Sequence, residues 1–223
     1  MILNFKKINK HIFSNGNKKK IAKNKEWDLS SFEKILKKYD INDELKLHLI
    51  RTSIYSEVMA DILCVDKEKI KKIKKGALLH DIGKLKIDSC LLIKKQDISI
   101  EDFKKMQTHS RLGLTLLLEE DYDEVVEKII ILHHEAWNGN GYPFGLRGKD
   151  IPIEARIVAV ANFYDKLVEN YWCKKEYLED EILLMLKENA GKEFDPDIIA
   201  IIEIFQVKLK VLCKKMIINK LYK

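Results

Sequence analysis

The sequence predicts an all-α domain, and three observations carry this prediction. All three prolines lie beyond residue 142, so the first 142 residues contain no helix-breaking proline. Four of the nine glycines fall within Gly139–Gly148, which marks one loop in a chain otherwise poor in turn residues. Alternating patterns typical of strands are almost absent. With 46% hydrophobic residues among 223, the chain can bury a sizeable core.

Start and stop signals divide the chain into successive helices. Ser30 and Glu33 form a capping-box pattern, which predicts a first helix beginning at Ser30. Gly83 and Gly191 are expected to stop helices, because glycine readily adopts the conformation that ends a helix. The later helices are expected over residues 42–64, 66–84, 99–119, 123–135, 152–169, 176–190 and from 195 onward, with a Gly-rich loop over 138–150.

Composition limits the organisation and the partners. Residues 1–26 are basic and rich in asparagine, so we predict an N-terminal arm there and a single helical domain over residues 27–223. The formal net charge of +6 is carried almost wholly by lysine, and only four residues are arginine. Because arginine is the usual choice for bidentate contacts with phosphates and bases, no nucleic-acid polymer is expected as a partner.

Hydropathy and cysteine usage predict the compartment. No apolar run approaches the ~18 residues of a membrane span, so no membrane partner is expected. The cysteines are widely scattered and form no CxxC pair, which argues against a disulfide scaffold. We therefore predict a reduced, cytoplasmic location. The four cysteines are Cys64, Cys90, Cys173 and Cys213.

Histidines at the ends of apolar runs predict a metal centre. His80-Asp81 follows Gly-Ala-Leu-Leu, and His133-His134 follows Ile-Ile-Ile-Leu. Polar side chains at such buried positions need partners, and a divalent metal ion would supply them. Imidazole and carboxylate suit zinc, iron and manganese, and the donors exceed what one tetrahedral ion needs. Two or three ions are the economical interpretation.

Two further donors lie upstream, and each candidate has an ordinary alternative. Glu44 and His48 are four residues apart, so they share one helix face. Taken alone, Glu44 would be a solvated acid in a first helical turn, and His48 a surface residue. His109 alone would more often be a structural residue than a ligand. The ordered motifs around His80 and His133 favour the metal interpretation.

These motifs resemble the HD-GYP family, a branch of the HD metal-dependent phosphohydrolases. The resemblance covers about residues 42–206 and rests on several ordered segments. His48 lies 32 residues before His80, as is usual in the family. The matching segments are Leu78-Leu79-His80-Asp81-Ile82-Gly83-Lys84, Phe103-x-x-Met106-x-x-His109, His133-His134-Glu135-x-Trp137-x-Gly139-x-Gly141-Tyr142-Pro143, Gly145-Leu146-x-Gly148-x-x-Ile151-Pro152, Ala155-Arg156-Ile157 and Phe194-Asp195-Pro196.

The resemblance implies an HD-superfamily helical bundle with a GYP loop beside a centre of two or three ions, most often iron or manganese. It implies catalytic roles for Asp81 and Lys84, and contacts to substrate from Lys84, Tyr142 and Lys174. The implied metal ligands are Glu44, His48, His80, Asp81, His109, His133, His134 and Asn162.

Three departures from the family pattern bear on activity. Asn162 stands where the family has an aspartate ligand, and its neutral carbonyl oxygen is a weaker ligand. Tyr171-Trp172-Cys173-Lys174 replaces an Arg-Pro-Tyr-Arg segment, so only Lys174 keeps a positive charge there. Asn138 replaces an aspartate, a change of less consequence.

The resemblance implies a phosphodiesterase that hydrolyses cyclic di-GMP to pGpG or GMP by metal-assisted attack of water on phosphorus. Asn162 motivates one alternative, a degenerate domain that binds nucleotide, or a partner protein through its GYP loop, without efficient turnover. The altered 171–174 segment motivates a second, hydrolysis of another cyclic dinucleotide. A third alternative, a helical interaction module with accidental histidines, predicts no bound metal.

Overall fold

The computed structural model describes residues 41–88, 90–91, 99–117, 123–173 and 179–221. Within these ranges the regular structure is helical, and the only β feature is an isolated bridge between Ala190 and Phe194. The predicted all-α fold is therefore confirmed. The arm predicted over residues 1–26 and the helix predicted from Ser30 lie outside the described residues, so the domain boundary at residue 27 stays a prediction.

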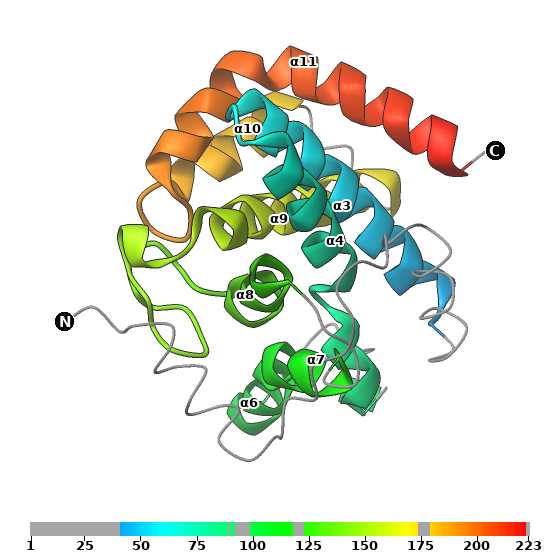
Figure 1. The fold of residues 1–223 in the computed structure, drawn as a ribbon, viewed down its shortest axis with the longest axis vertical. Coiled ribbons are helices and arrows are strands. Elements are labelled where there is room, and N and C mark those ends of the chain that lie inside the picture. The colour runs from blue at the N-terminus through cyan, green and yellow to red at the C-terminus, as the bar shows by residue number, and fades with distance from the viewer. Residues whose placement is uncertain (1–40, 89, 92–98, 118–122, 174–178, 222–223) are drawn as a thin grey trace.

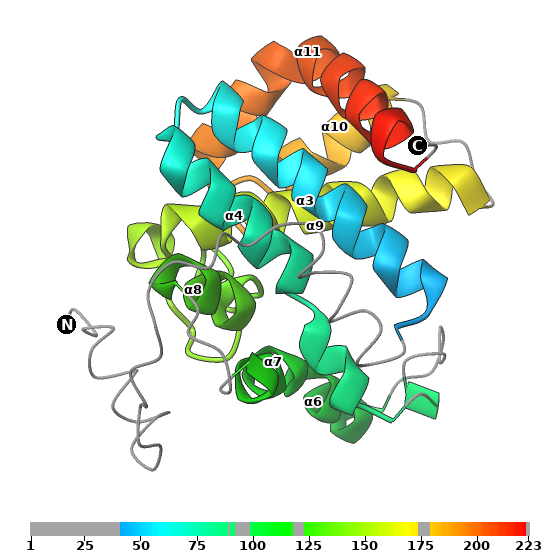
Figure 2. The same cartoon turned by 45° about the vertical axis from the view of Figure 1, so that its right-hand side comes forward.

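The helices of the described residues are shown in Figures 1 and 2. Their bounds are α3 Asp43–Ile62, α4 Lys67–Leu79, η1 Ile82–Lys86, α6 Ile100–Gln107, α7 His109–Leu117, α8 Glu124–Leu132, η2 Gly148–Asp150, α9 Ile153–Cys173, α10 Glu179–Glu188 and α11 Pro196–Leu221, where η denotes a 3-10 helix. No helix of the described residues is both long and apolar enough to cross a membrane.

Side-chain caps fix four of the predicted helix starts. The side chain of Asn42 accepts a hydrogen bond from the Leu45 backbone N–H at 2.8 Å, at the start of α3. Asp66, Ser99 and Asp123 cap α4, α6 and α8 in the same way. Each cap satisfies backbone donors that have no partner within the helix.

The second of these capped helices ends earlier than predicted. The helix predicted over 66–84 ends at Leu79, where the chain turns through His80 and Asp81 into η1. Gly83 therefore does not stop a helix; it lies inside η1, where a Cβ would come within 1.9 Å of the His109 carbonyl oxygen. The absent side chain lets η1 pass directly against the start of α7.

The helix predicted over 99–119 is broken at Thr108. The Thr108 hydroxyl donates to the Lys105 carbonyl at 2.6 Å, and the Thr108 backbone N–H donates to the same carbonyl. This local bonding competes with helix continuation and separates α6 from α7. His109 consequently stands at the first position of a new helix.

The core lies where α3 packs against α4, α9 and α11, and where α8 packs against α4 and α9. Helix α7 packs against η1 and α8. In both views α10 and α11 lie at one end of the molecule and α6 and α7 at the other (Figures 1 and 2). Large apolar side chains fill the interior between these ends: Leu49, Ile54, Met59, Ile73, Leu79, Ile129 and Ile157.

Candidate metal centre

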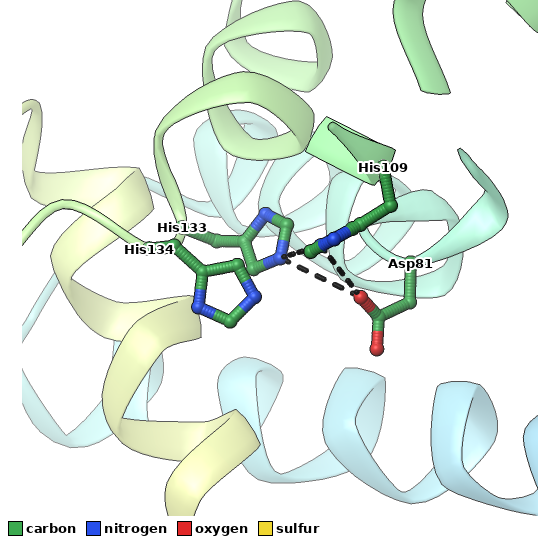
Figure 3. A group of neighbouring side chains, drawn as sticks. All are labelled: Asp81, His109, His133 and His134. Carbon is green, nitrogen blue, oxygen red and sulfur yellow. Dashed lines mark hydrogen bonds and ion pairs between the residues drawn. The ribbon is translucent and has the colours of Figure 1, made fainter. Parts of the chain in front are cut away.

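Five histidines and one aspartate from separate helices converge on one place. Within the described part of the chain, two groups of side chains could each hold a metal ion. In each group the potential ligand atoms lie within 4.8 Å of one another. The first group is His48, His80 and Asp81, and the second is Asp81, His109, His133 and His134. Figure 3 shows the three rings of the second group turned toward the Asp81 carboxylate.

Local structure places each ligand at a helix end or on a buried face. His80 and His133 follow the last residues of α4 and α8, at the end of apolar runs that are buried in the core. His109 opens α7 because of the break at Thr108. His48 lies on the buried face of α3. The apolar runs therefore bury the site, and the positions of the helix ends orient the ligand atoms toward it.

Asp81 is shared by the two groups, one oxygen to each. Its Oδ2 lies 3.4 Å from Nε2 of His48 and 3.4 Å from Nε2 of His80. Its Oδ1 lies 3.2 Å from Nε2 of His109 and 3.6 Å from Nε2 of His133. A carboxylate with this arrangement can bridge two ions.

In the rings of His80, His109 and His133 the outer nitrogen is held by a backbone acceptor. Nδ1 of His80 lies 2.7 Å from the Ala77 carbonyl oxygen, and Nδ1 of His109 lies 2.7 Å from that of Met106. Nδ1 of His133 lies 3.0 Å from the Ile130 carbonyl oxygen. These acceptors assign the ring proton to Nδ1, which leaves the Nε2 lone pairs facing the site.

The inner nitrogens then face one another in a way that a bound metal ion would satisfy. Nε2 of His48 lies 3.3 Å from Nε2 of His80, and the same distance separates Nε2 of His109 and His133. Two nitrogens that both carry lone pairs cannot hydrogen-bond to each other. A metal ion between them would turn this repulsion into coordination.

Two buried oxygen atoms support the same conclusion. Among the described residues, Oδ1 of Asp81 and Oδ1 of Asn162 are two of five buried side-chain atoms without a hydrogen-bond partner. Such atoms are costly unless a ligand satisfies them. Asn162 is 3% exposed and lies on α9, which packs against α3 and α8. The residues present therefore fit a metal centre.

The electrostatics keep Asp81 ionised. Burial alone would raise the pKa of Asp81, but the ammonium of Lys84 and the surrounding rings hold it well below its usual value. Nζ of Lys84 lies 2.5 Å from Oδ2 of Asp81.

Most of the surrounding rings are held neutral. Burial lowers the pKa of His80 and lowers that of His133 to about 3, with neighbouring rings adding to the effect at His133. Burial also holds the pKa of His134 well below its usual value. Neutral rings keep the lone pairs that a metal ion needs.

His48 differs from the other ligands because a second carboxylate holds it. Its Nδ1 donates to Oδ2 of Asp165 at 2.7 Å, and Nε of Arg51 donates to Oδ1 of the same carboxylate at 2.6 Å. Burial disfavours the charged ring, but the hydrogen bonds to Asp165 and Asp81 outweigh it and raise the pKa of His48. A carboxylate behind a ligating histidine orients the ring and makes it a stronger ligand.

Sequence analysis did not single out Asp165. One signal was available, because Asp165 lies three residues after Asn162 on one helix and therefore close to the same face. Its partner His48 is 117 residues away, so no local pattern connects the two.

The remaining predicted site residues differ in their position. Glu44 is exposed in the first turn of α3 and belongs to neither group of potential ligands. Lys174 lies outside the described residues. Tyr142 stacks on the ring of His134, with centroids 4.7 Å apart and planes 19° apart, and burial raises the pKa of its hydroxyl. Tyr142 thus places the Gly-rich loop beside the centre, as predicted.

The loop itself is tied down more firmly than its glycines indicate. The carboxylate of Glu135 accepts hydrogen bonds from the backbone N–H groups of Phe144 at 2.7 Å and Leu146 at 2.8 Å. The Tyr142 N–H donates to the His134 carbonyl at 3.1 Å. At Gly141 a Cβ would meet the Ala136 nitrogen at 2.2 Å, so the loop folds back closely on its own start.

The comparisons with known proteins agree with this geometry. A family model described as HD domain matches residues 21–198, which is most of the chain. The chain belongs to the HD domain family. The resemblance to its HD-GYP branch is also confirmed by the curated relatives that follow.

Two curated relatives are phosphodiesterases by name. A probable cyclic di-GMP phosphodiesterase of Vibrio cholerae is 35% identical over 68% of this chain and 38% of its own length. The cyclic di-GMP phosphodiesterase response regulator RpfG of Xanthomonas campestris is 36% identical over 66% of this chain and 40% of its own length. The chain thus spans about two fifths of the length of these relatives.

Solved structures share the fold of this HD domain. An HDG"Y"P protein from Bdellovibrio bacteriovorus superposes with a TM-score of 0.56 and 24% identity, over 80% of this chain and 58% of that protein. A cyclic GMP-AMP-specific phosphodiesterase of Vibrio cholerae superposes with a TM-score of 0.54 and 20% identity, over 71% of this chain and 43% of that protein.

Proposed function

We propose that this HD domain is a metal-dependent phosphodiesterase that hydrolyses cyclic di-GMP to pGpG or GMP. The observation that carries the proposal is the carboxylate of Asp81, which offers one oxygen to each of two histidine pairs. The names of the curated relatives support the cyclic dinucleotide as substrate.

The proposed cofactor is a set of two or three divalent ions, with iron or manganese favoured. His48, His80 and Asp81 would hold one ion, with Asn162 nearby, and the second histidine group would hold another. When bound, such ions lower the pKa of water and offset negative charge on a phosphodiester. Glu44 remains a proposed ligand for a third ion, because it lies one helical turn before His48 on α3.

Two cations and one aromatic ring are proposed to handle the substrate. Lys84 is 28% exposed beside Asp81, so its ammonium can contact a phosphate oxygen without leaving the site. Tyr142 packs on His134 at the edge of the centre and would lie beside a guanine base. Lys174 is proposed as a further phosphate contact. Asp81 and Lys84 are accordingly the proposed catalytic residues.

Metal analysis combined with turnover tests this proposal. We expect the purified protein to carry iron or manganese and to hydrolyse cyclic di-GMP under reducing, anaerobic conditions. His80→Ala should lose both metal and turnover, whereas His11→Ala, in the N-terminal segment, should change neither. Unchanged metal stoichiometry in His80→Ala would count decisively against the metal centre.

Asn162 supports a second candidate function. A neutral amide at a ligand position is a weaker donor than a carboxylate, and a domain with such a centre would bind a nucleotide, or a protein through loop 138–150, with little turnover. Turnover that appears only in Asn162→Asp would favour this candidate, and a substrate panel including 3'3'-cGAMP would separate the cyclic dinucleotides. The scattered cysteines support a cytoplasmic location for either function, which cell fractionation tests.

A further inference from the structure

A lysine that the sequence motifs do not include lies beside the proposed metal centre. Lys166 follows Asn162 by four residues on α9, so both side chains leave the same face of the helix, with Cβ atoms about 6 Å apart. Asn162 is buried three residues before Asp165, which contacts His48, whereas Lys166 is exposed to solvent. One helical turn therefore leads from the interior of the site to its surface.

The charged groups of the centre act on Lys166. Burial lowers the pKa of its ammonium and Lys84 adds to this effect, whereas the carboxylates of Asp81, Asp165 and Glu193 oppose it. The Lys166 residue is exposed on α9, and its ammonium lies within the electrostatic range of the ligand Asp81 and the cation Lys84. An anion bound between the two lysines would favour both charged forms.

Lys166 also differs from Lys84 and Arg51 because, among the described residues, its ammonium forms no ion pair. Lys84 pairs with Asp81, and Arg51 pairs with Asp165. No hydrogen bond or ion pair joins the Lys166 ammonium to another side chain in the described parts of the chain. Its charge remains available to a ligand.

We propose that Lys166 binds the second phosphate of a cyclic dinucleotide, the one that is not being cleaved. This inference rests on the proposed function. A cyclic dinucleotide carries two phosphodiesters, and the one under attack would be held by the ions and Lys84. The other would face solvent, where the Lys166 ammonium, one helical turn from Asn162, can meet it. Lys166 would therefore determine affinity for two-phosphate substrates.

Three variants test the role of this charge. Lys166→Met removes the charge and keeps much of the chain length, and Lys166→Arg keeps the charge. Lys67→Met is the matched control, because Lys67 is exposed at the far end of α4, roughly 20 Å along the helix from His80. Circular dichroism should show the same helical content for all three.

Comparing a ligand with two phosphates and a substrate with one distinguishes binding of the second phosphate from binding of the cleaved one. Binding of a slowly cleaved phosphorothioate analogue of cyclic di-GMP to the metal-loaded protein is measured by calorimetry at several KCl concentrations. Hydrolysis of bis(p-nitrophenyl) phosphate, which carries a single phosphate, is measured in parallel. We expect Lys166→Met to raise Kd for the analogue about tenfold and to flatten its salt dependence. It should leave kcat/KM for the single-phosphate substrate within about twofold, with Lys166→Arg and Lys67→Met close to wild type.

Unchanged affinity for the analogue in Lys166→Met would overturn the inference about Lys166 but leave the proposed function standing. An equal loss with both ligands would also overturn it, because Lys166 would then act on the cleaved phosphate or on the centre itself. A wild-type protein that neither binds the analogue nor hydrolyses cyclic di-GMP would overturn the proposed function, and the inference with it.

Discussion

The two sides of the centre are held in different ways. On the α3 side, which comprises His48 with Asp165 and Arg51, side-chain charges orient the ring. On the α7–α8 side, which comprises His109 and His133, backbone carbonyls at helix ends hold the outer nitrogens. The pKa of His48 is raised by its carboxylate neighbours, whereas burial lowers that of His133 to about 3.

This difference teaches how each side can fail. The α3 side depends on a side chain of a distant helix, so one substitution on α9 can release His48 without touching a ligand. The α7–α8 side depends on where helices stop, and in the described parts of the chain the outer nitrogens of His109 and His133 are held by backbone carbonyls. Asp81 connects the two sides, so its loss should affect both.

Asp81→Asn should have the largest effect, because it removes the charge that both sides share. The variant keeps the shape of the side chain but offers only one neutral oxygen. We expect loss of bound metal and a fall in phosphodiesterase activity of at least about 1000-fold, measured by elemental analysis and product chromatography.

Asp61→Asn is the control for this prediction, since Asp61 is exposed on α3 and belongs to neither ligand group. A normal metal content in Asp81→Asn would refute the shared-carboxylate arrangement.

Asp165→Asn should weaken the α3 side selectively. The amide cannot offer His48 a charged acceptor, so we expect about a 10–100-fold loss of metal affinity at one site. The α7–α8 side should keep its affinity, because its rings are anchored on carbonyls. Competition titration with a chromogenic chelator would resolve the two sites. Equal weakening of both sites would mean that the two sides are not independent.

The two sides also differ in how far the sequence could predict them. His80 and His133 follow apolar runs, so burial and proximity could be predicted from the local pattern. The anchor of His48 could not, because Asp165 is distant in sequence and only the packing of α3 on α9 joins them. Glu44 shows a related limit: a shared helix face fixes the direction of a side chain, but not whether it reaches the ligands.

The fold shows the same division between local and long-range causes. Capping residues marked the starts of α3, α4, α6 and α8 correctly, because a cap acts within one helical turn. The ends of helices were less predictable. The stop at Leu79 and the break at Thr108 arise where η1 and α7 approach each other closely around Gly83.

The protonation of His133 predicts a pH dependence of the metal-free protein. The pKa of His133 is about 3 in the folded chain and about 6.5 when unfolded, so between these values only the unfolded chain binds the proton. The free energy of unfolding therefore falls as the pH falls below about 6.5. By pH 5 the loss from this residue should approach about 2 kcal/mol.

Urea unfolding of metal-free wild type and His133→Asn at pH 5, 6 and 8 measures this contribution. The variant should show a shallower fall in stability than the wild type, because position 133 no longer titrates. His48, whose pKa is raised, acts in the opposite sense: its stabilisation is present below pH 6.5 and declines at higher pH. Because both wild type and His133→Asn contain His48, its contribution cancels when their free energies of unfolding are subtracted. Parallel curves would show that His133 is not held neutral.

The smallest effect should come from Glu135, which fixes the loop next to the α7–α8 side. Glu135→Gln keeps one acceptor oxygen but loses the charge that holds the Phe144 and Leu146 N–H groups. We expect a local destabilisation of about 1 kcal/mol, seen as roughly fivefold faster hydrogen exchange at these two amides. Exchange in α3 should not change, because no Glu135 contact of the described residues reaches that helix. Faster exchange throughout the chain would instead make Glu135 a determinant of global stability. The loop would then open only when the core unfolds.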